Sequence, residues 1–217
     1  GDVYQINYTQ PITFHYNQKE PLDLYMQIKE KAKPKYGFYL DINKTQILSF
    51  SPEKFFKKTN NLIESYPIKG TVKRFKNPKK DLHQIMQLSK SEKDRAEHLM
   101  IVDLLRNDIG KISEFGSIEV NNLYNIKTFE TIHHMESKIK GISIQGLKEI
   151  EVIKALFPGG SITGAPKYRA VQIIDELEDY YRGLYTGCLG TIENNGNMDF
   201  NICIRTMTIN NNIATYP

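Results

Sequence analysis

Residues 67–71 read Pro-Ile-Lys-Gly-Thr, between a predicted strand at 62–65 and a basic stretch from Lys73 to Lys80. Gly70 permits a positive backbone φ or a close approach of the main chain to a ligand. We therefore expect a turn that leaves Lys69 free to point into a cleft. A lone Lys-Gly pair in a lysine-rich chain is more often a solvated turn, so the rest of the sequence decides between the two.

The composition is that of an ordinary soluble globular protein. The 217 residues are 40% hydrophobic and 25% charged, enough for one large domain or two small ones. A net charge of +4 is too mild to indicate nucleic acid but suits a small anionic substrate. Cys188 and Cys203 lie in apolar runs without metal-ligand spacing, so we expect reduced core residues and a cytoplasmic protein. We expect no membrane span, because no apolar run is long enough.

The pattern along the chain mixes strands and helices without strict alternation. Residues 3–9 alternate like a strand already under way and 217 follows a strand, so we interpret the chain as an excerpt of a longer protein. Ser91 with Asp94 is a helix-capping signature. The predicted elements are a hairpin of 36–42 with 46–50, helices at 81–88, 91–108 and 147–156, a strand at 128–138, a helix from Pro166 that buries Ala170, Ile174 and Leu177, and two or three C-terminal antiparallel strands.

Glu97 shares a helix face with apolar residues. Met100, Ile101 and Leu104 follow it at helical spacing, and an unpaired carboxylate buried there would be costly. A magnesium ion or a basic side chain could satisfy it, and spacing alone favours the basic side chain. Asp94, one turn earlier, could support either.

A glycine-rich loop runs from Gly159 to Lys167 into a helix N-terminus. Its backbone amides, the hydroxyls of Ser161 and Thr163, and Lys167 favour a bound carboxylate, because the spacing does not fit a phosphate-binding Walker loop. Simple helix capping by the two hydroxyls is almost as good an interpretation.

Two further patterns involve strands. A three-residue loop at 194–196 would set Tyr185 opposite Arg205, whereas a two-residue turn would put Arg205 on the other face. His133 and His134 should point to opposite faces of one strand, so at most one serves a site.

Taken together, these segments resemble the chorismate-utilising enzymes. The motifs that carry the resemblance are residues 1–7, Ser51-Pro52-Glu53, 67–71, 97–104 with Arg106-Asn107-Asp108, 161–167 and 182–187. The resemblance implies an α/β fold of the α+β type: two large, mostly antiparallel sheets packed face to face, with outer helices and a site at the sheet edge. Residues 1–217 would be a chorismate-binding catalytic domain, incomplete at both ends and lacking the C-terminal helix that completes the metal site.

The resemblance also implies roles. Glu97, with Asp94 as an outer partner, would bind Mg²⁺ and through it the ring carboxylate of chorismate. Glu53 would be the general acid, and His134 would lie beside the reacting ring. Tyr185 and Arg205 would hold the enolpyruvyl carboxylate. The implied substrate-binding set is Gln5, Thr71, Ser161, Thr163, Gly164, Lys167, Tyr185 and Arg205.

Two positions select a branch of the family. Hydroxylating members have a lysine base where this chain has Gln5, and glutamine cannot activate water. Lys69 is typical of the branch that aminates C4, in which the lysine amine attacks C2 and ammonia from a glutamine amidotransferase subunit then attacks C4. The alternatives are amination at C2 with pyruvate loss, and a chorismate-binding module without turnover.

Overall fold

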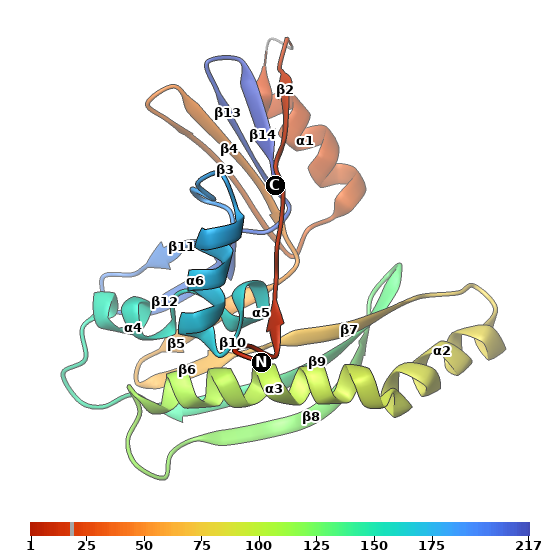
Figure 1. The fold of residues 1–217 in the computed structure, drawn as a ribbon, viewed down its shortest axis with the longest axis vertical. Coiled ribbons are helices and arrows are strands. Elements are labelled where there is room, and N and C mark those ends of the chain that lie inside the picture. The colour runs from red at the N-terminus through yellow and green to blue at the C-terminus, as the bar shows by residue number, and fades with distance from the viewer. Residues whose placement is uncertain (18–19) are drawn as a thin grey trace.

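The computed structural model describes residues 1–17 and 20–217, which form a mixed α/β fold (Figure 1). The helices are α1 (Pro21–Ala32), α2 (Pro78–Lys90), α3 (Glu92–Gly110), α4 (Glu149–Leu156), α5 (Gly160–Thr163) and α6 (Lys167–Leu177). The strands are β1 (Gln5–Ile6), β2 (Ile12–His15), β3 (Tyr36–Ile42), β4 (Thr45–Ser51), β5 (Lys54–Thr59), β6 (Leu62–Ser65), β7 (Ile68–Lys73), β8 (Glu119–Thr128), β9 (Ile132–Ile142), β10 (Gly164–Ala165), β11 (Cys188–Ile192), β12 (Met198–Ile202), β13 (Thr206–Asn210) and β14 (Ile213–Tyr216).

The strands form two large sheets and one small one, and every pairing is antiparallel. The seven-stranded sheet has the order β11-β12-β5-β6-β9-β7, with β8 also paired to β9. The five-stranded sheet has the order β2-β14-β13-β4-β3, and β1 pairs with β10. Figure 1 shows α1 against the five-stranded sheet and α3 running along the seven-stranded one. The expected class, antiparallel sheets with outer helices, is confirmed.

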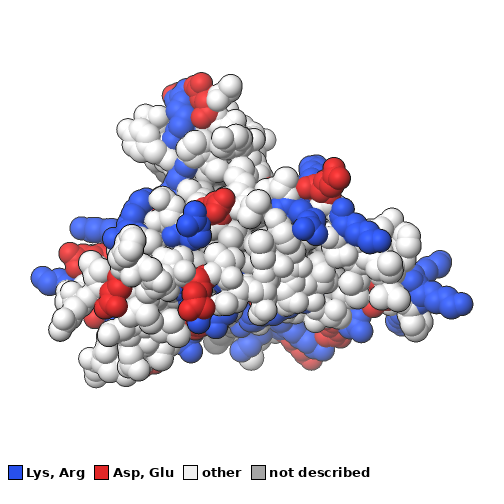
Figure 2. Space-filling view, turned by 90° about the horizontal axis from the view of Figure 1, so that it is seen from below, with Lys and Arg blue, Asp and Glu red and all other residues white. Residues whose placement is uncertain are grey.

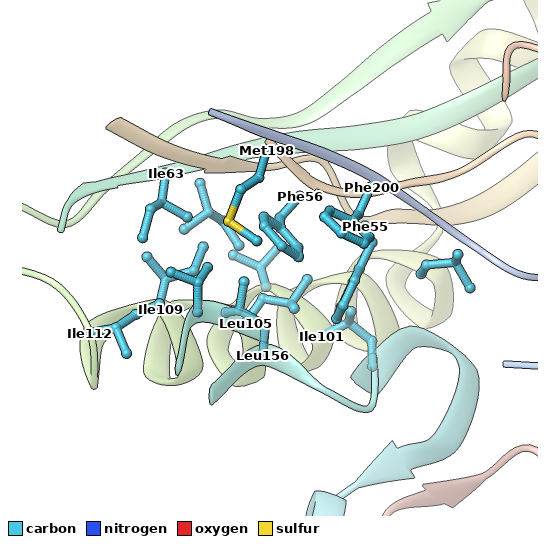
Figure 3. Packing of buried hydrophobic residues seen from close by; sticks show 14 of the residues in the cluster. Phe55, Phe56, Ile63, Ile101, Leu105, Ile109, Ile112, Leu156, Met198 and Phe200 are labelled. Carbon is cyan, nitrogen blue, oxygen red and sulfur yellow. The ribbon is translucent and has the colours of Figure 1, made fainter. Parts of the chain in front are cut away.

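The apolar core is divided into two clusters, one on each large sheet. On the seven-stranded sheet, Phe56, Ile63 and Met198 meet Ile101 and Leu105 of α3 (Figure 3). On the five-stranded sheet, Leu48 and Ile209 pack with Tyr25 of α1. Both clusters therefore lie between a sheet and its helices, rather than in one layer between the sheets. Burial of each large apolar side chain contributes roughly 1.5–3 kcal/mol, so α3 is firmly held.

Helix α3 begins where the sequence predicts. The Ser91 hydroxyl accepts a hydrogen bond from the Asp94 amide at 3.3 Å, which caps the helix. Its buried face includes Ile101 and Leu105, and this face fixes which side chains point toward β7.

The segment around Lys69 differs from the expectation. Residues 68–73 are a strand, β7, rather than a turn, and they pair with β9. Lys69 pairs with Met135 and Thr71 with His134, so Gly70 is the extra residue of a β-bulge, with φ +76°. The backbone freedom predicted for Gly70 is used to make this bulge, which re-aims the neighbouring Lys69.

Several other expectations are corrected. The predicted strand at 128–138 is the end of β8, a turn and then β9, and residues 3–9 contain only the short β1. Leu177 is 56% exposed, because α6 ends there and turns it to solvent. The C-terminal region holds four strands, and they divide between the two large sheets instead of forming one hairpin.

Candidate active site

The side chains of Lys69 and Glu97 form an ion pair between β7 and α3. The Lys69 Nζ lies 3.3 Å from Glu97 Oε1, and the two side chains are 16% and 28% exposed. Of the two partners that spacing allowed for Glu97, the structure supplies the basic one. Asp94 lies beside the same bulge, since a Cβ added to Gly70 would come within 3.2 Å of the Asp94 Cβ. The two carboxylates on α3 therefore both border the bulge.

Glu53 is a buried carboxyl group next to this pair. It follows β4, and its Oε1 accepts a hydrogen bond from the Ser161 hydroxyl at 2.9 Å. Burial raises the pKa of Glu53 to about 7, against the opposing effects of the Ser161 hydrogen bond and the charge of Lys69. Glu53 can therefore carry a proton near neutral pH, as a general acid must.

His134 lies on the far side of the bulge. Its Nδ1 is 2.6 Å from the Thr71 hydroxyl, and the ring of Phe129 meets its ring edge-on. Burial, and then the charge of Arg205, lower the pKa of His134. His134 is therefore neutral at physiological pH, with a hydrogen-bonding tie to the strand that carries Lys69.

The glycine-rich loop connects to the N-terminal strand. Gln5 pairs with Ala165, and a Cβ on Gly164 would lie 2.1 Å from the Gln5 carbonyl oxygen, so only glycine permits this approach. Thr163 donates to the Gly159 carbonyl. The loop thus brings Ser161 to Glu53, and Gln5 lies at its edge.

Lys167 does not point into this loop. Its ammonium donates to Asp108 of α3 and to the Leu156 carbonyl at 2.9 Å. Burial lowers the pKa of Lys167, and Asp108 acts in the opposite direction. Lys167 joins α6 to α3 and α4 here, and its expected contact with a substrate carboxylate has no support in this geometry.

The placement of Tyr185 and Arg205 is only partly as expected. The Glu193 amide donates to the Asn197 carbonyl at 2.9 Å and Gly196 has φ +81°, so the three-residue turn is confirmed. The ladder, however, ends at Cys188 and Ile202, before either residue. Arg205 has φ +51° at the crossing between sheets and borders His134, whereas Tyr185 lies in a turn near Arg182. No contact between Tyr185 and Arg205 is found among the described residues.

His98 is a buried neighbour of the site that the sequence did not single out. Its Nε2 is 2.6 Å from the Ser137 hydroxyl, and burial together with the charge of Lys69 lowers the pKa of His98 to about 4. In the sequence, only its position next to Glu97 could have indicated that His98 lies near the site. The residue faces β9 because α3 turns its adjacent positions to different sides.

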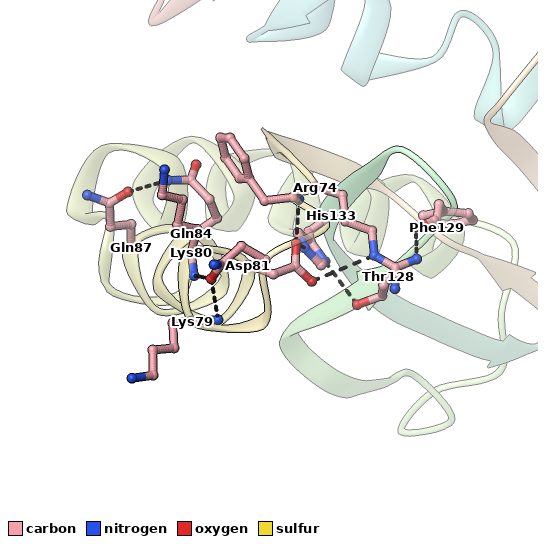
Figure 4. Close-up of polar contacts among 11 residues, drawn as sticks. Arg74, Lys79, Lys80, Asp81, Gln84, Gln87, Thr128, Phe129 and His133 are labelled. Carbon is pink, nitrogen blue, oxygen red and sulfur yellow. Dashed lines mark hydrogen bonds and ion pairs between the residues drawn. The ribbon is translucent and has the colours of Figure 1, made fainter.

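A second buried polar network holds α2 in place (Figure 4). His133 is fully buried; its Nε2 is 2.9 Å from Asp81 Oδ1, and its Nδ1 is 2.9 Å from the Thr128 hydroxyl. The Phe75 amide, and then His133, lower the pKa of Asp81. His133 and His134 lie on opposite faces of β9 as predicted, and only His134 borders the Lys69 site.

The metal expectation was tested against the donors present. Within residues 1–17 and 20–217, no group of three or more His, Cys, Asp or Glu side chains could hold a metal ion. Glu97 and Asp94 nevertheless suit Mg²⁺, which commonly binds through one or two carboxylates and keeps several waters. An open groove of about 990 Å³, lined by Gln5, Glu97 and Leu104 among others, gives access to Glu97.

The fold and the sequence together place this chain in a known enzyme family. The family model of the chorismate binding enzymes matches residues 1–217, and the chain belongs to that family. It is 41% identical over 99% of its length to aminodeoxychorismate synthase, chloroplastic, of Arabidopsis thaliana, and 42% identical over 96% to aminodeoxychorismate synthase component 1 of Escherichia coli. It spans 24% and 46% of the lengths of these relatives.

A solved structure agrees with this assignment. Anthranilate synthase component I of Streptococcus pneumoniae superposes with a TM-score of 0.90 at 34% identity, covering 99% of this chain and 47% of that one. Over the part of the chain that the structure describes, no helix has the length and apolar character needed to cross a membrane.

Proposed function

We propose that this chain is the chorismate-binding part of a component I that aminates chorismate at C4. The product would be 4-amino-4-deoxychorismate, a precursor of 4-aminobenzoate and folate, in the cytoplasm. The observation that carries the proposal is the Lys69 side chain, which the bulge aims at Glu97, with Glu53, whose pKa is raised to about 7, nearby. The two aminodeoxychorismate synthase relatives support the same chemistry.

The covalent steps use two side chains, Lys69 of β7 and Glu53 of the loop that follows β4. The neutral Lys69 amine attacks C2, both conjugated ring double bonds shift by one position, and the C4 hydroxyl leaves as water with a proton from Glu53. Ammonia then attacks C4, both double bonds shift back, and the C2–N bond to Lys69 breaks. The lysine recovers its lone pair, and the proton lost by the incoming ammonia returns Glu53 to its acid form.

The metal would be held by Glu97, with Asp94 as its outer partner. When bound, Mg²⁺ would anchor the ring carboxylate of the substrate. Glu97 would then contact the metal instead of Lys69, and the lysine side chain would be released to face the substrate. In this proposal the Glu97 carboxylate pairs with Lys69 when no metal is bound and binds Mg²⁺ when the metal is present.

Other residues would orient the substrate. Ser161 and the backbone at Thr163 and Gly164 would meet the ring carboxylate, while Arg205 and Tyr185 would meet the enolpyruvyl carboxylate. His134 and Thr71 would lie beside the ring. Gln5 would occupy the edge of the site without activating water, because an amide cannot act as a base.

The test is product analysis by mass spectrometry on the complete protein, given chorismate, MgCl₂ and an ammonium salt. Lys69→Ala is assayed in parallel. Aminodeoxychorismate formed without pyruvate, and strongly reduced in the variant, is the expected result. Anthranilate with pyruvate would overturn the proposal in favour of C2 amination. Chorismate binding without product would favour a module without turnover.

Amination at C2 is the second candidate, because the solved structure with 34% identity is an anthranilate synthase component I. His134 is the residue that this alternative would need most. The presence of Lys69 opposite Glu97 favours C4, because its amine can serve as the nucleophile of the covalent route.

A further inference from the structure

Helix α2 has a face that packs on no other element among the residues that the structure describes, and this face points away from the rest of the protein. Lys79, Leu82, His83, Met86 and Lys90 follow one another at helical spacing and are all exposed. We call these five residues the α2 stripe. Leu82 is 57% and Met86 46% exposed. The opposite face of α2 carries Asp81 and the buried Leu88, which face the protein, so the α2 stripe is the exposed face of the helix within residues 1–17 and 20–217.

The α2 stripe lies in a basic part of the chain. Residues 73–95 contain eight lysines and arginines and three acidic residues, a formal charge of +5, against +4 for all 217 residues. In Figure 2 basic side chains protrude at the right-hand end, where Figure 1 places α2. Figure 4 shows Lys79 pointing away from the Asp81–His133 network. Among the described residues, neither Lys79 nor Lys90 has a carboxylate within ion-pair distance.

The back of α2 rests on the bulge that carries the candidate nucleophile. A Cβ added to Gly70 would come within 2.9 Å of Leu88 Cδ1, so Leu88 packs directly on the bulge. A hollow of about 540 Å³ reaches from His83 and Met86 of the α2 stripe to Asp94, beside the same bulge. A partner seated on α2 would therefore stand next to the Lys69 site.

We propose that the α2 stripe docks a protein partner whose surface combines apolar and acidic side chains, namely the component that supplies ammonia. This inference rests on the proposed function. Leu82 and Met86 would form the apolar centre, and Lys79 and Lys90 would pair with carboxylates at its rim. A membrane fits the stripe poorly, because two apolar side chains are too few to anchor an interfacial helix.

The apolar centre is tested with the complete protein and the amidotransferase component from the same source. The double variant Leu82→Asp/Met86→Asp is compared with Leu177→Asp, a similarly exposed leucine on α6. Affinity is measured by calorimetry, and product formation is driven either by glutamine through the partner or by ammonium salt. We expect the double variant to lose about tenfold or more in affinity and in glutamine-driven rate, with the ammonium-driven rate unchanged. The control should match the wild type.

The charged rim is tested with Lys79→Glu/Lys90→Glu, whose exposed positions leave the helix intact. We expect weaker binding, with a smaller difference from the wild type at high salt. Partner affinity within twofold of the wild type in both double variants would overturn the inference. So would loss of self-association, or of binding to anionic phosphatidylserine vesicles, with partner affinity intact. Absence of product from ammonium would instead overturn the proposed function, while the affinity measurement still decides the docking surface.

Discussion

Lys69 and Glu97 are bound to each other, 3.3 Å apart, although the proposed chemistry needs both of them free. The proposed attack on C2 uses the Lys69 side chain, and the proposed metal site uses the Glu97 carboxylate. Under the proposed function, substrate and Mg²⁺ would therefore have to break this ion pair.

Lys69→Ala should abolish amination while chorismate still binds. The attacking amine is lost, and removing a residue that forms a covalent intermediate costs on the order of 10³-fold or more in rate. Ammonium-driven product formation measures the loss of amination, and calorimetry measures whether chorismate still binds. Lys73→Ala, an exposed lysine on the same strand, is the matched control and should retain the wild-type rate. Equal losses in both variants would contradict the special role of Lys69.

Glu97→Gln should weaken Mg²⁺ binding in the presence of chorismate. Loss of a carboxylate ligand is expected to cost roughly tenfold or more in metal affinity. Titration calorimetry with MgCl₂ measures this without relying on turnover. Glu92→Gln removes an exposed carboxylate from the first turn of the same helix and should leave the affinity unchanged. An unchanged affinity in Glu97→Gln would place the metal elsewhere.

Glu53→Gln should raise the free energy of unfolding at high pH. The same change should lower the rate of the ammonium-driven reaction at every pH. Burial raises the pKa of Glu53 from 4.5 to about 7, so the unfolded chain releases this proton before the folded one does. The wild type therefore loses stability from this group between pH 4.5 and 7, and the loss is complete above pH 7. The glutamine variant does not titrate, so its advantage should be absent at low pH and reach about 3 kcal/mol above neutrality.

Urea denaturation at several pH values measures this advantage, and the ammonium-driven rate should fall by roughly 10² to 10⁴-fold because the acid is lost. A stability difference that is independent of pH would show that Glu53 is ionised in the folded state. That outcome would also remove it as the general acid.

Arg205→Gln should raise the pKa of His134. The charge of Arg205 acts together with burial to hold that pKa below its usual value, so removing the charge relieves part of the depression. NMR titration of the imidazole measures it directly. His133, on the other face of β9, is the internal control, because its partners are Asp81 and Thr128 and it should not respond. A lowered pKa for His134 would contradict the placement of Arg205.

The sequence predicted the site best where one element supplied the geometry. Helix α3 could be predicted from its cap at Ser91 and its apolar spacing, and with it the position of Glu97. Local chemistry left two turns open at Gly196, and the structure has the three-residue one. Arg205 could not be placed this way, because the chain leaves one sheet for the other between β12 and β13, and no periodic pattern shows a crossing between sheets.

The structure around Lys69 also could not be predicted from the local sequence pattern. Its Lys-Gly pair has the composition of a turn, but β9 supplies partners for residues on both sides of Gly70, and the long-range ladder converts the turn into a bulge. The ion pair of Lys167 could not be predicted for a related reason. Asp108 lies 59 positions away in the chain, and only the packing of α6 on α3 brings the two together.

Gly70→Ala should therefore damage both stability and rate. Its φ of +76° costs a residue with a side chain roughly 1–2 kcal/mol, and the new methyl group would also meet Leu88 at 2.9 Å and Asp94 at 3.2 Å. Gly146→Ala is the matched control, because Gly146 has φ +77° and open space around it. The backbone strain is the same in both variants, so the difference between their unfolding free energies isolates the contact behind the bulge.

We expect Gly70→Ala to be less stable than Gly146→Ala by about 1–3 kcal/mol, measured by urea denaturation. Only Gly70→Ala should slow the ammonium-driven reaction, on the order of 100-fold, because a shift of about 1 Å in Lys69 misaligns its amine. Equal losses of stability would mean that α2 yields to the methyl group. A Gly70→Ala protein that is destabilised but keeps the wild-type rate would show that the bulge is not needed to orient Lys69. The structural argument for this lysine as the nucleophile would then be lost.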